Sequence, residues 1–235
     1  MGENFFSILF YSFYIFEGNY VEFKRTIESY IEDANSDCFI FDGDKQIDLN
    51  INGGREISRR IHNYAASWLS LVDHTRRVQR KLKDHASTDI QNFANEYETR
   101  LSKNLMPTFE NIFVKDLRNY IQHKGVPVPT LRLTLHQAKN MALDSDGTSL
   151  QGSYSFEINS SEFDTNFEWK PKSKEYLKNN RSVPIVTIID QHFSAIRDFY
   201  RWIQFRDHQL HPYAPREARE ITFEDWKQKT MECEA

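Results

Sequence analysis

The sequence predicts a mainly α-helical fold, a bundle of long antiparallel helices with a small inserted β-hairpin. Two patterns predict it. Apolar residues recur at three- and four-residue steps over long stretches, which is the period of a helix with one buried face. Alternation of apolar and polar residues, the period of a strand, is confined to short segments. Of the 235 residues 39% are hydrophobic, including 18 Phe and 11 Tyr, so the chain can bury a sizeable core.

Residues 1–52 are expected to form an N-terminal unit. The run Phe5–Phe16 predicts a buried helix or strand, and its aromatic density alternatively marks an oligomer interface. It is too short to span a bilayer, and it has neither a basic flank nor a small-residue cleavage site. A helix is predicted over Asn19–Asp33. Alternation from Phe39 to Ile51 around a glycine turn at Asp42–Asp44 predicts a small hairpin, ended by Asn52-Gly53-Gly54.

Residues 53–210 are expected to form the bundle. A long helix is predicted from Arg55 to Asp84, with apolar residues at near-heptad spacing, and Ser87 opens the next helix. The stretch Phe109–His123 predicts an amphipathic helix with Pro107 in its first turn. Gly125, Pro127 and Pro129 then give a strong stop signal.

A β-hairpin insertion is predicted at about residues 130–159, followed by further helices. Its strands are expected at Leu131–Leu135 and Tyr154–Ile158, with a turn at Asp144–Gly147. The segment Ser160–Asn180 predicts a short capped helix that Pro171 breaks.

The last long helix is predicted from a first-turn Pro184 to Ile203 and ends before Pro212 and Pro215. Residues 211–235 are expected to form a tail with one short helix, opened by a capping box at Thr222–Asp225.

Composition excludes several classes of function. The net charge of −4 argues against uniform attraction to nucleic acid, so an RNA site would have to be a local basic patch. Cys38 and Cys233 are too few for a disulfide scaffold, which fits a cytoplasmic location. His62, His74 and His85 lie 12 and 11 residues apart on one helix, which is not a metal-ligand spacing. We therefore expect neither a metal nor a cofactor.

Three residues near the end of the Phe109–His123 helix are suited to phosphate chemistry: Arg118, Asn119 and His123. A guanidinium can grip phosphate oxygens in a planar, bidentate arrangement. Histidine is the usual side chain for proton transfer near neutral pH. Asn119 lies four residues before His123 on the same helix face and can orient the imidazole ring or the phosphate.

The pattern Arg118–His123, with its Gly125–Pro129 tail and the helix that contains Asn63–Arg77, resembles the signature of the HEPN superfamily, in a group of bacterial HEPN-like proteins. The resemblance covers residues 51–129 well and residues 153–203 loosely. It implies a HEPN-like helical bundle and, in active branches, a metal-independent endoribonuclease of toxins or anti-phage defence. In that family two copies of the signature usually meet at a dimer interface.

The partners expected on this basis are RNA, a second copy of the chain, and an antitoxin or another defence-system protein, without a membrane. The cationic side chains of Arg76, Arg77, Arg80 and Lys81 form a helix face that can hold an RNA backbone, or alternatively a solvated surface.

Two alternatives stay open. A second match to the letter pattern runs from Arg206 to His211, and Arg132 with His136 is a near miss. The rival function is a non-catalytic helical module that binds a partner protein or RNA, in which Arg118 and His123 merely cap a helix.

Overall fold

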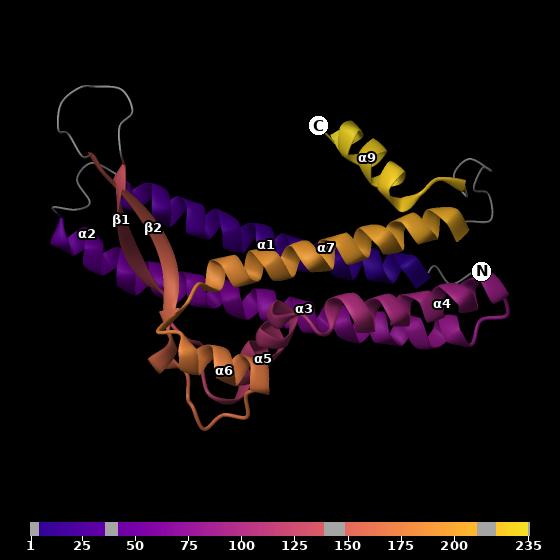
Figure 1. The fold of residues 1–235 in the computed structure, drawn as a ribbon, viewed down its shortest axis with the longest axis horizontal. Coiled ribbons are helices and arrows are strands. Elements are labelled where there is room, and N and C mark those ends of the chain that lie inside the picture. Colours follow the sequence, from indigo (N-terminus) through magenta and orange to yellow (C-terminus); the bar gives the residue numbers. More distant parts are fainter. Residues whose placement is uncertain (1–4, 36–41, 139–148, 211–219, 235) are drawn as a thin grey trace. The chain divides into compact units, whose positions relative to one another are not determined.

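The computed structural model describes residues 5–35, 42–138, 149–210 and 220–234 (Figure 1). They are mainly helical with a small antiparallel sheet, which confirms the predicted mainly α fold with a β-hairpin. The helices are α1 (Phe5–Ala34), α2 (Gly43–Asp48), α3 (Gly54–Lys83), α4 (Thr88–Arg100), α5 (Phe109–His123), α6 (Pro171–Asn179), α7 (Ile185–Leu210) and α9 (Phe223–Glu234).

The chain forms two compact units, each assembled from segments far apart in the sequence. The first unit comprises residues 1–18, 66–112 and 190–235, and the second comprises residues 19–65 and 113–189. Helices α1, α3, α5 and α7 each contribute residues to both units. Arg118 and His123 therefore belong to the second unit, whereas the basic face of α3 belongs to the first.

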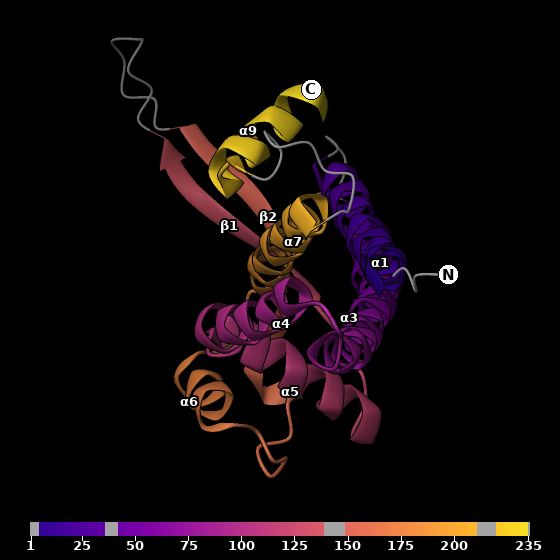
Figure 2. The same ribbon diagram turned by 90° about the vertical axis from the view of Figure 1, so that its right-hand side faces the viewer.

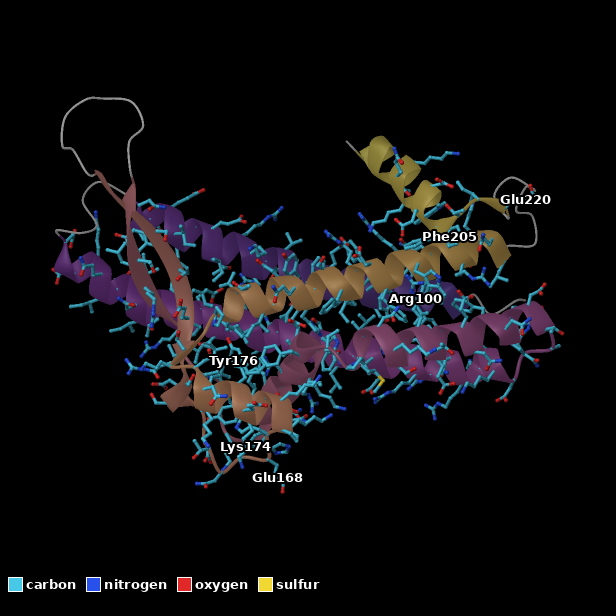
Figure 3. The ribbon with its side chains drawn as sticks, viewed as in Figure 1. Arg100, Glu168, Lys174, Tyr176, Phe205 and Glu220 are labelled. Atoms are coloured by element: carbon cyan, nitrogen blue, oxygen red, sulfur yellow. The ribbon has the colours of Figure 1, made fainter. Side chains whose placement is uncertain are left out.

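The core of the first unit is rich in aromatic contacts between α4 and α7, which lie side by side (Figure 2). The rings of Phe93 and Trp202 are 5.5 Å apart, and those of Tyr97 and Phe199 are 5.1 Å apart. Such pairs add to the free energy of burying the rings. The guanidinium of Arg100 lies 5.0 Å from the centre of the Trp202 ring, a cation–π contact (Figure 3).

The second unit contains the sheet, whose described strands are in the order β1-β2-β3. Strand β1 (Thr130–Ala138) pairs antiparallel with β2 (Ser149–Asn159), as predicted. The predicted turn Asp144–Gly147 lies outside the described residues. A two-residue strand β3 (Ser182–Val183), which was not predicted, pairs with the end of β2.

The predicted hairpin around Asp42–Asp44 is wrong, because helix α2 begins there. The carboxylate of Asp42 accepts a hydrogen bond from the backbone N–H of Lys45 at 3.0 Å and so caps the helix. A π-helical turn, Leu49–Gly53, then leads directly into α3, so the two glycines continue the helix rather than end a strand. The remaining part of that prediction, Phe39–Phe41, lies outside the described residues.

Two prolines occupy positions relative to their helices that differ from the predicted ones. Pro107 precedes α5, whose N-cap is Thr108; its hydroxyl accepts a hydrogen bond from the N–H of Asn111 at 3.4 Å. Pro171 occupies the first turn of α6 and opens that helix instead of breaking one. The predicted stop signals Pro212 and Pro215 lie outside the described residues.

The chain ends agree with the sequence patterns in their helices, although Tyr11, Tyr14 and Ile15 of the run Phe5–Phe16 are exposed rather than buried. The run Phe5–Phe16 is helical and continues without a break into the helix predicted over Asn19–Asp33, so both form α1. The hydroxyl of Thr222 accepts a hydrogen bond from the N–H of Asp225 at 3.2 Å, which confirms the predicted cap of α9.

The Gly125–Pro129 segment is fixed against the start of α3. The hydroxyl of Ser58 donates a hydrogen bond to the carbonyl of Pro127 at 2.9 Å. A methyl group in place of the Gly54 hydrogen would lie 2.7 Å from the carbonyl oxygen of Pro129, so only glycine permits this approach. Gly125 has a backbone φ of 145°, a conformation that residues with a side chain rarely adopt. The segment after α5 is thus held by α3.

The adjacent glycines provide a matched pair of variants. Gly54→Ala is expected to lower the free energy of unfolding by about 1–2 kcal/mol, because a clash with a backbone carbonyl outweighs the gain in helix propensity. Gly53→Ala is expected to leave it unchanged or raise it by up to about 1 kcal/mol, since the added carbon meets only the Tyr30 ring, at 3.5 Å. Urea unfolding measures both, and equal effects would contradict the close approach.

Candidate functional site

Helix α5 has one buried face and one face that reaches solvent. Phe113, Val114, Asp116, Leu117, Tyr120 and Ile121 are buried. Arg118 and Asn119 are half-buried, and His123 in the last turn is exposed. The period of the helix thus brings the three candidate residues to the accessible side while the opposite side anchors them.

An aromatic cluster fixes the orientation of α5 against the chain that leads into α6. The Trp169 ring stacks on Tyr120, with centroids 5.2 Å apart, and on Phe113 at 6.2 Å. The buried carboxylate of Asp116 accepts a hydrogen bond from the N–H of Lys170 at 2.9 Å. These contacts restrain the helix that carries the candidate residues.

The end of α5 is tied to the segment that follows β2. The Tyr120 hydroxyl donates to the carbonyl of Glu162 and accepts from the N–H of Asp164, both at 3.1 Å. The ammonium of Lys124 lies 2.9 Å from the Asp164 carboxylate. This hydrogen bond lowers the pKa of Asp164 and raises the pKa of Lys124. The residue after His123 is therefore an anchored cation.

Arg118 and Asn119 form a pair within the candidate site. A terminal nitrogen of the guanidinium donates a hydrogen bond to the Asn119 side-chain oxygen at 3.2 Å. Asn119 therefore holds the arginine rather than the imidazole of His123 in this state. Among the described residues, none makes a hydrogen bond or an ion pair with the His123 side chain, which remains open to a ligand.

Arg118 and His123 do not point the same way. Five residues separate them, which corresponds to about 140° around an ideal helix. A phosphate that contacts one of these side chains at the helix surface is thus not held by the other through helix geometry alone. One chain therefore presents both groups at the accessible side of α5 without directing them to one point.

The basic face predicted on α3 is exposed at all four residues, Arg76, Arg77, Arg80 and Lys81. Arg76 lies 3.6 Å from the carboxylate of Asp73, in an ion pair that is itself exposed. This face belongs to the first unit, so within the second unit it supplies no cation to the surface of α5.

A second basic surface, which the sequence patterns did not predict, lies on α6 and the residues that flank it, in the same unit as His123. Lys170, Lys174, Lys178 and Arg181 are exposed, and the three lysines follow one another at four-residue steps. Helix α6 packs on α5 through Tyr176, whose ring centroid is 6.1 Å from that of Phe113 (Lys174 and Tyr176 in Figure 3). The signal in the sequence was the i, i+4 spacing of the lysines.

The alternative match at Arg206 contributes to packing. Its guanidinium donates to the side-chain oxygen of Gln209 at 2.7 Å and lies 3.2 Å from the carboxylate of Glu96 on α4. The matching histidine, His211, lies outside the described residues.

The near miss at Arg132 has a partner on the neighbouring strand. Its guanidinium lies 3.0 Å from the carboxylate of Glu157, two residues along β2 from Ser155, the residue that pairs with Arg132. Strand β1 includes His136, whose side chain is outside the described residues.

The other histidines have local contacts. His74 forms a hydrogen bond with the Ser12 hydroxyl at 2.6 Å, and His85 accepts one from the N–H of Ser87 at 3.0 Å. His192 is fully buried beside the Trp68 ring. Within the part of the chain that the structure describes, no group of three His, Cys, Asp or Glu side chains could hold a metal ion.

Two shallow hollows in the second unit lie away from the candidate residues. One of about 470 Å³ is lined by α2 and the π-helical turn, with Ile47 and Ile51 at its wall. The other, of about 400 Å³, lies between α1 and α3 and contains the Arg60–Glu22 ion pair. Neither is lined by Arg118, Asn119 or His123. The candidate residues therefore lie on an open surface rather than in either hollow.

Helices in residues 5–35, 42–138, 149–210 and 220–234 are all too short or too polar to cross a membrane. No family model, curated protein or solved structure matches this chain.

Proposed function

We propose that this chain is a metal-independent endoribonuclease of HEPN type that acts in the cytoplasm, as a toxin or in anti-phage defence. One observation carries the proposal: α5 is anchored on one face, and its other face offers solvent Arg118, held by Asn119, and His123, whose side chain has no hydrogen bond or ion pair to the described residues. A cation that grips phosphate beside a proton-transfer group is what cleavage of RNA without a metal requires.

The reaction balances with these groups alone. His123 accepts the proton of the ribose 2′-hydroxyl, and the 2′-oxygen attacks the adjacent phosphorus. Arg118 stabilises the negative charge that develops on the phosphoryl oxygens. The bond from phosphorus to the 5′-oxygen breaks, and the leaving oxygen takes a proton from an imidazolium. The products are a 2′,3′-cyclic phosphate and a 5′-hydroxyl.

The angle between the two side chains favours a site shared by two copies of the chain. About 140° separates Arg118 from His123 around α5, so one helix does not converge them on a phosphate. A two-fold axis beside the accessible face of α5 would place His123 of one copy near Arg118 of the other. We therefore propose a homodimer as the active form.

The surface on α6 is the better candidate for the RNA backbone, because α6 packs directly on α5. Lys170, Lys174 and Lys178 are exposed, and a polyanion neutralised by such a row releases counterions, which makes binding depend on salt. The α3 face with Arg76, Arg77 and Arg80 is the other candidate. Both can be tested in one experiment.

Neutralising the α6 row, by Lys170→Gln, Lys174→Gln and Lys178→Gln together, is expected to weaken binding of single-stranded RNA about tenfold or more. The slope of log affinity against log salt should fall by roughly 2, at about 0.7 per lost contact. Fluorescence anisotropy with labelled RNA measures both quantities. The matched control carries glutamine at Arg76, Arg77 and Arg80; if only this variant loses affinity, RNA lies along α3 instead.

The decisive assay for cleavage uses purified protein and end-labelled single-stranded RNA in the presence of EDTA. Wild-type protein should give fragments that end in a 2′,3′-cyclic phosphate, and His123→Ala should give none. Equal cleavage by both proteins would contradict the proposal that His123 acts in cleavage. In that case the Arg206–His211 match would be the next site to replace.

A second function, a non-catalytic interaction module, is favoured by a separate observation. The N-terminal half of α1 exposes large apolar side chains, including Tyr11 at 74% and Tyr14 at 73% of their surface. Exposed aromatic groups of this kind are typical of protein interfaces. A protein without ribonuclease activity that still associates through this surface would support the module.

A further inference from the structure

The first half of α1 has an apolar face whose side chains are exposed in the part of the chain that the structure describes. Ile8 is 46% exposed, Tyr11 74%, Tyr14 73% and Ile15 60%. Single exposed apolar residues are normal, but contiguous exposed patches of this kind mark interaction sites. At about 100° per residue, these four positions fall within roughly 120° of the helix circumference. They form one face, called here the α1 face.

The α1 face is held rigidly by the opposite side of the same helix. Leu9, Ser12 and Phe16 are buried in the first unit. The Phe13 ring stacks on Tyr200 of α7, with centroids 4.9 Å apart. A partner would meet a surface that is already formed, which lowers the entropy cost of binding.

The charge pattern restricts what can cover the α1 face. Residues 5–18 contain no Lys or Arg, and Glu17 is their one charged residue. Helices that lie on lipid surfaces are typically rich in Lys and Arg on their polar side, so a membrane is disfavoured. A partner that carries no charge at the contact is required, and the uncharged stretch Ser7–Phe16 of a second copy meets that requirement.

The area also fits a second copy. The exposed parts of the four side chains amount to roughly 500 Å² per chain, because a tyrosine alone can bury 150–250 Å². A self-complementary contact buries this area twice and reaches about 1,000 Å², near the lower bound for a specific interface.

Gly18 suggests the register of the contact. It lies in the interior of a long helix, where glycine weakens the helix, and it is exposed with nothing within 4 Å of an added Cβ atom. Among the described residues, nothing around this position thus requires a glycine. In an antiparallel pair that places Tyr11 against Ile15 of the second copy, Gly18 faces Ile8 of that copy and lets the helices approach closely.

We infer that two copies of this chain associate through the α1 face, antiparallel about a two-fold axis at the level of Phe13. The contact is isologous, so each substitution occurs twice in it. The inference concerns residues of the first unit, and it does not rest on the proposed ribonuclease activity, because association is measured without RNA. If the shared α5 site belongs to the same dimer, both contacts lie about one two-fold axis, because a closed dimer of this kind has a single axis.

Sedimentation equilibrium on purified protein tests the inference with a matched pair of variants. Ile15→Arg is expected to raise the dimer dissociation constant about 100-fold or more, because two buried charges enter the interface. Ile47→Arg is the control: Ile47 is also a helical isoleucine, it is 59% exposed, and it belongs to helix α2 of the second unit rather than to the α1 face. This variant should dimerise as the wild type does. Circular dichroism checks that both variants fold.

A second variant probes the register. Gly18→Leu should raise the dissociation constant at least tenfold while the monomer melts no lower than the wild type, since the leucine has open space and favours the helix. A wild-type chain that stays monomeric across the micromolar range would overturn the inference. So would equal dimerisation of Ile15→Arg and Ile47→Arg, or capture of wild type by lipid vesicles without self-association.

Discussion

Replacement of His123 by alanine, and separately of Arg118 by alanine, is expected to lower the rate of RNA cleavage by about 10²–10⁴-fold each. Loss of the imidazole removes proton transfer, and loss of the guanidinium leaves the developing phosphoryl charge unstabilised. Both side chains reach solvent, so neither change should lower the melting temperature by more than a few degrees. Single-turnover cleavage of end-labelled RNA in EDTA measures the effect.

Mixing the two inactive proteins tests whether the site is shared between copies. If His123 of one copy acts with Arg118 of the other, the mixed dimer contains one complete site, and activity should return to roughly a quarter of the wild-type value, since half of the dimers are mixed and each has one of two sites. If both groups act within one chain, the mixture should stay inactive. The outcome decides how the 140° separation on α5 is overcome.

The control for both substitutions is Gln122→Ala. Gln122 is exposed in the last turn of α5 beside His123 and has no assigned role in the chemistry. It should cleave RNA at the wild-type rate. A loss of activity in this variant equal to that of His123→Ala would show that the end of α5 matters through its shape, and the role of the imidazole in proton transfer would then be withdrawn.

Helices with a strong period were predictable, because one buried face repeats over many turns. The prediction of Arg55–Asp84 matches α3, Gly54–Lys83, to within one residue at each end. The alternation of β1 and β2 also identified a hairpin, since each strand has a regular inward and outward pattern. The local sequence pattern is sufficient to predict an element when its hydrophobic period and its length indicate the same kind of structure.

Residues 42–54 show where a local signal fails. Ile47, Leu49 and Ile51 alternate in the sequence and predicted a strand, yet they are helical. Leu49 is buried, while Ile47 and Ile51 are exposed. Ile47 and Ile51 share a face because they are four residues apart on a helix, whereas in the sequence the three residues alternate as they would on a strand. The side-chain oxygen of Asn50 accepts a hydrogen bond from the N–H of Leu131 at 3.2 Å, 81 residues away. Such a contact cannot be predicted from the segment itself.

The candidate site likewise has a part that the sequence predicts and a part that it does not. Arg118 and His123 were found from their residue types and the helix period. The pairing of Arg118 with Asn119 depends on rotamers, and the anchoring of α5 by Trp169 depends on a contact 49 residues away from Tyr120. The lysine row lies on a helix that contacts α5 because Tyr176 packs on Phe113, a tertiary contact that the sequence does not predict. The candidate catalytic residues can be predicted from residue types, whereas the surroundings of the site depend on tertiary contacts.

Acid is expected to destabilise this protein in part through His192. The ring is fully buried in the first unit, 5.5 Å from the Trp68 ring and 6.4 Å from the Phe16 ring. Burial lowers the pKa of His192 to about 3, from an ordinary value of 6.5, because the charged form loses its water. Between these two values the unfolded chain binds a proton that the folded chain does not. Stability is therefore full above pH 6.5 and falls as the pH falls toward 3.

The expected loss is about 2 kcal/mol in the free energy of unfolding between pH 7.5 and pH 5, at about 1.4 kcal/mol for each pH unit below 6.5. Urea unfolding of wild type and His192→Leu at both pH values isolates this contribution, because every other titratable group is common to the two proteins. The variant should lose about 2 kcal/mol less than the wild type over this interval. An identical loss in both would mean that the folded protein protonates His192 as readily as the unfolded chain does. Water would then have to reach the ring beside Trp68, and the core of the first unit would be more open than its contacts indicate.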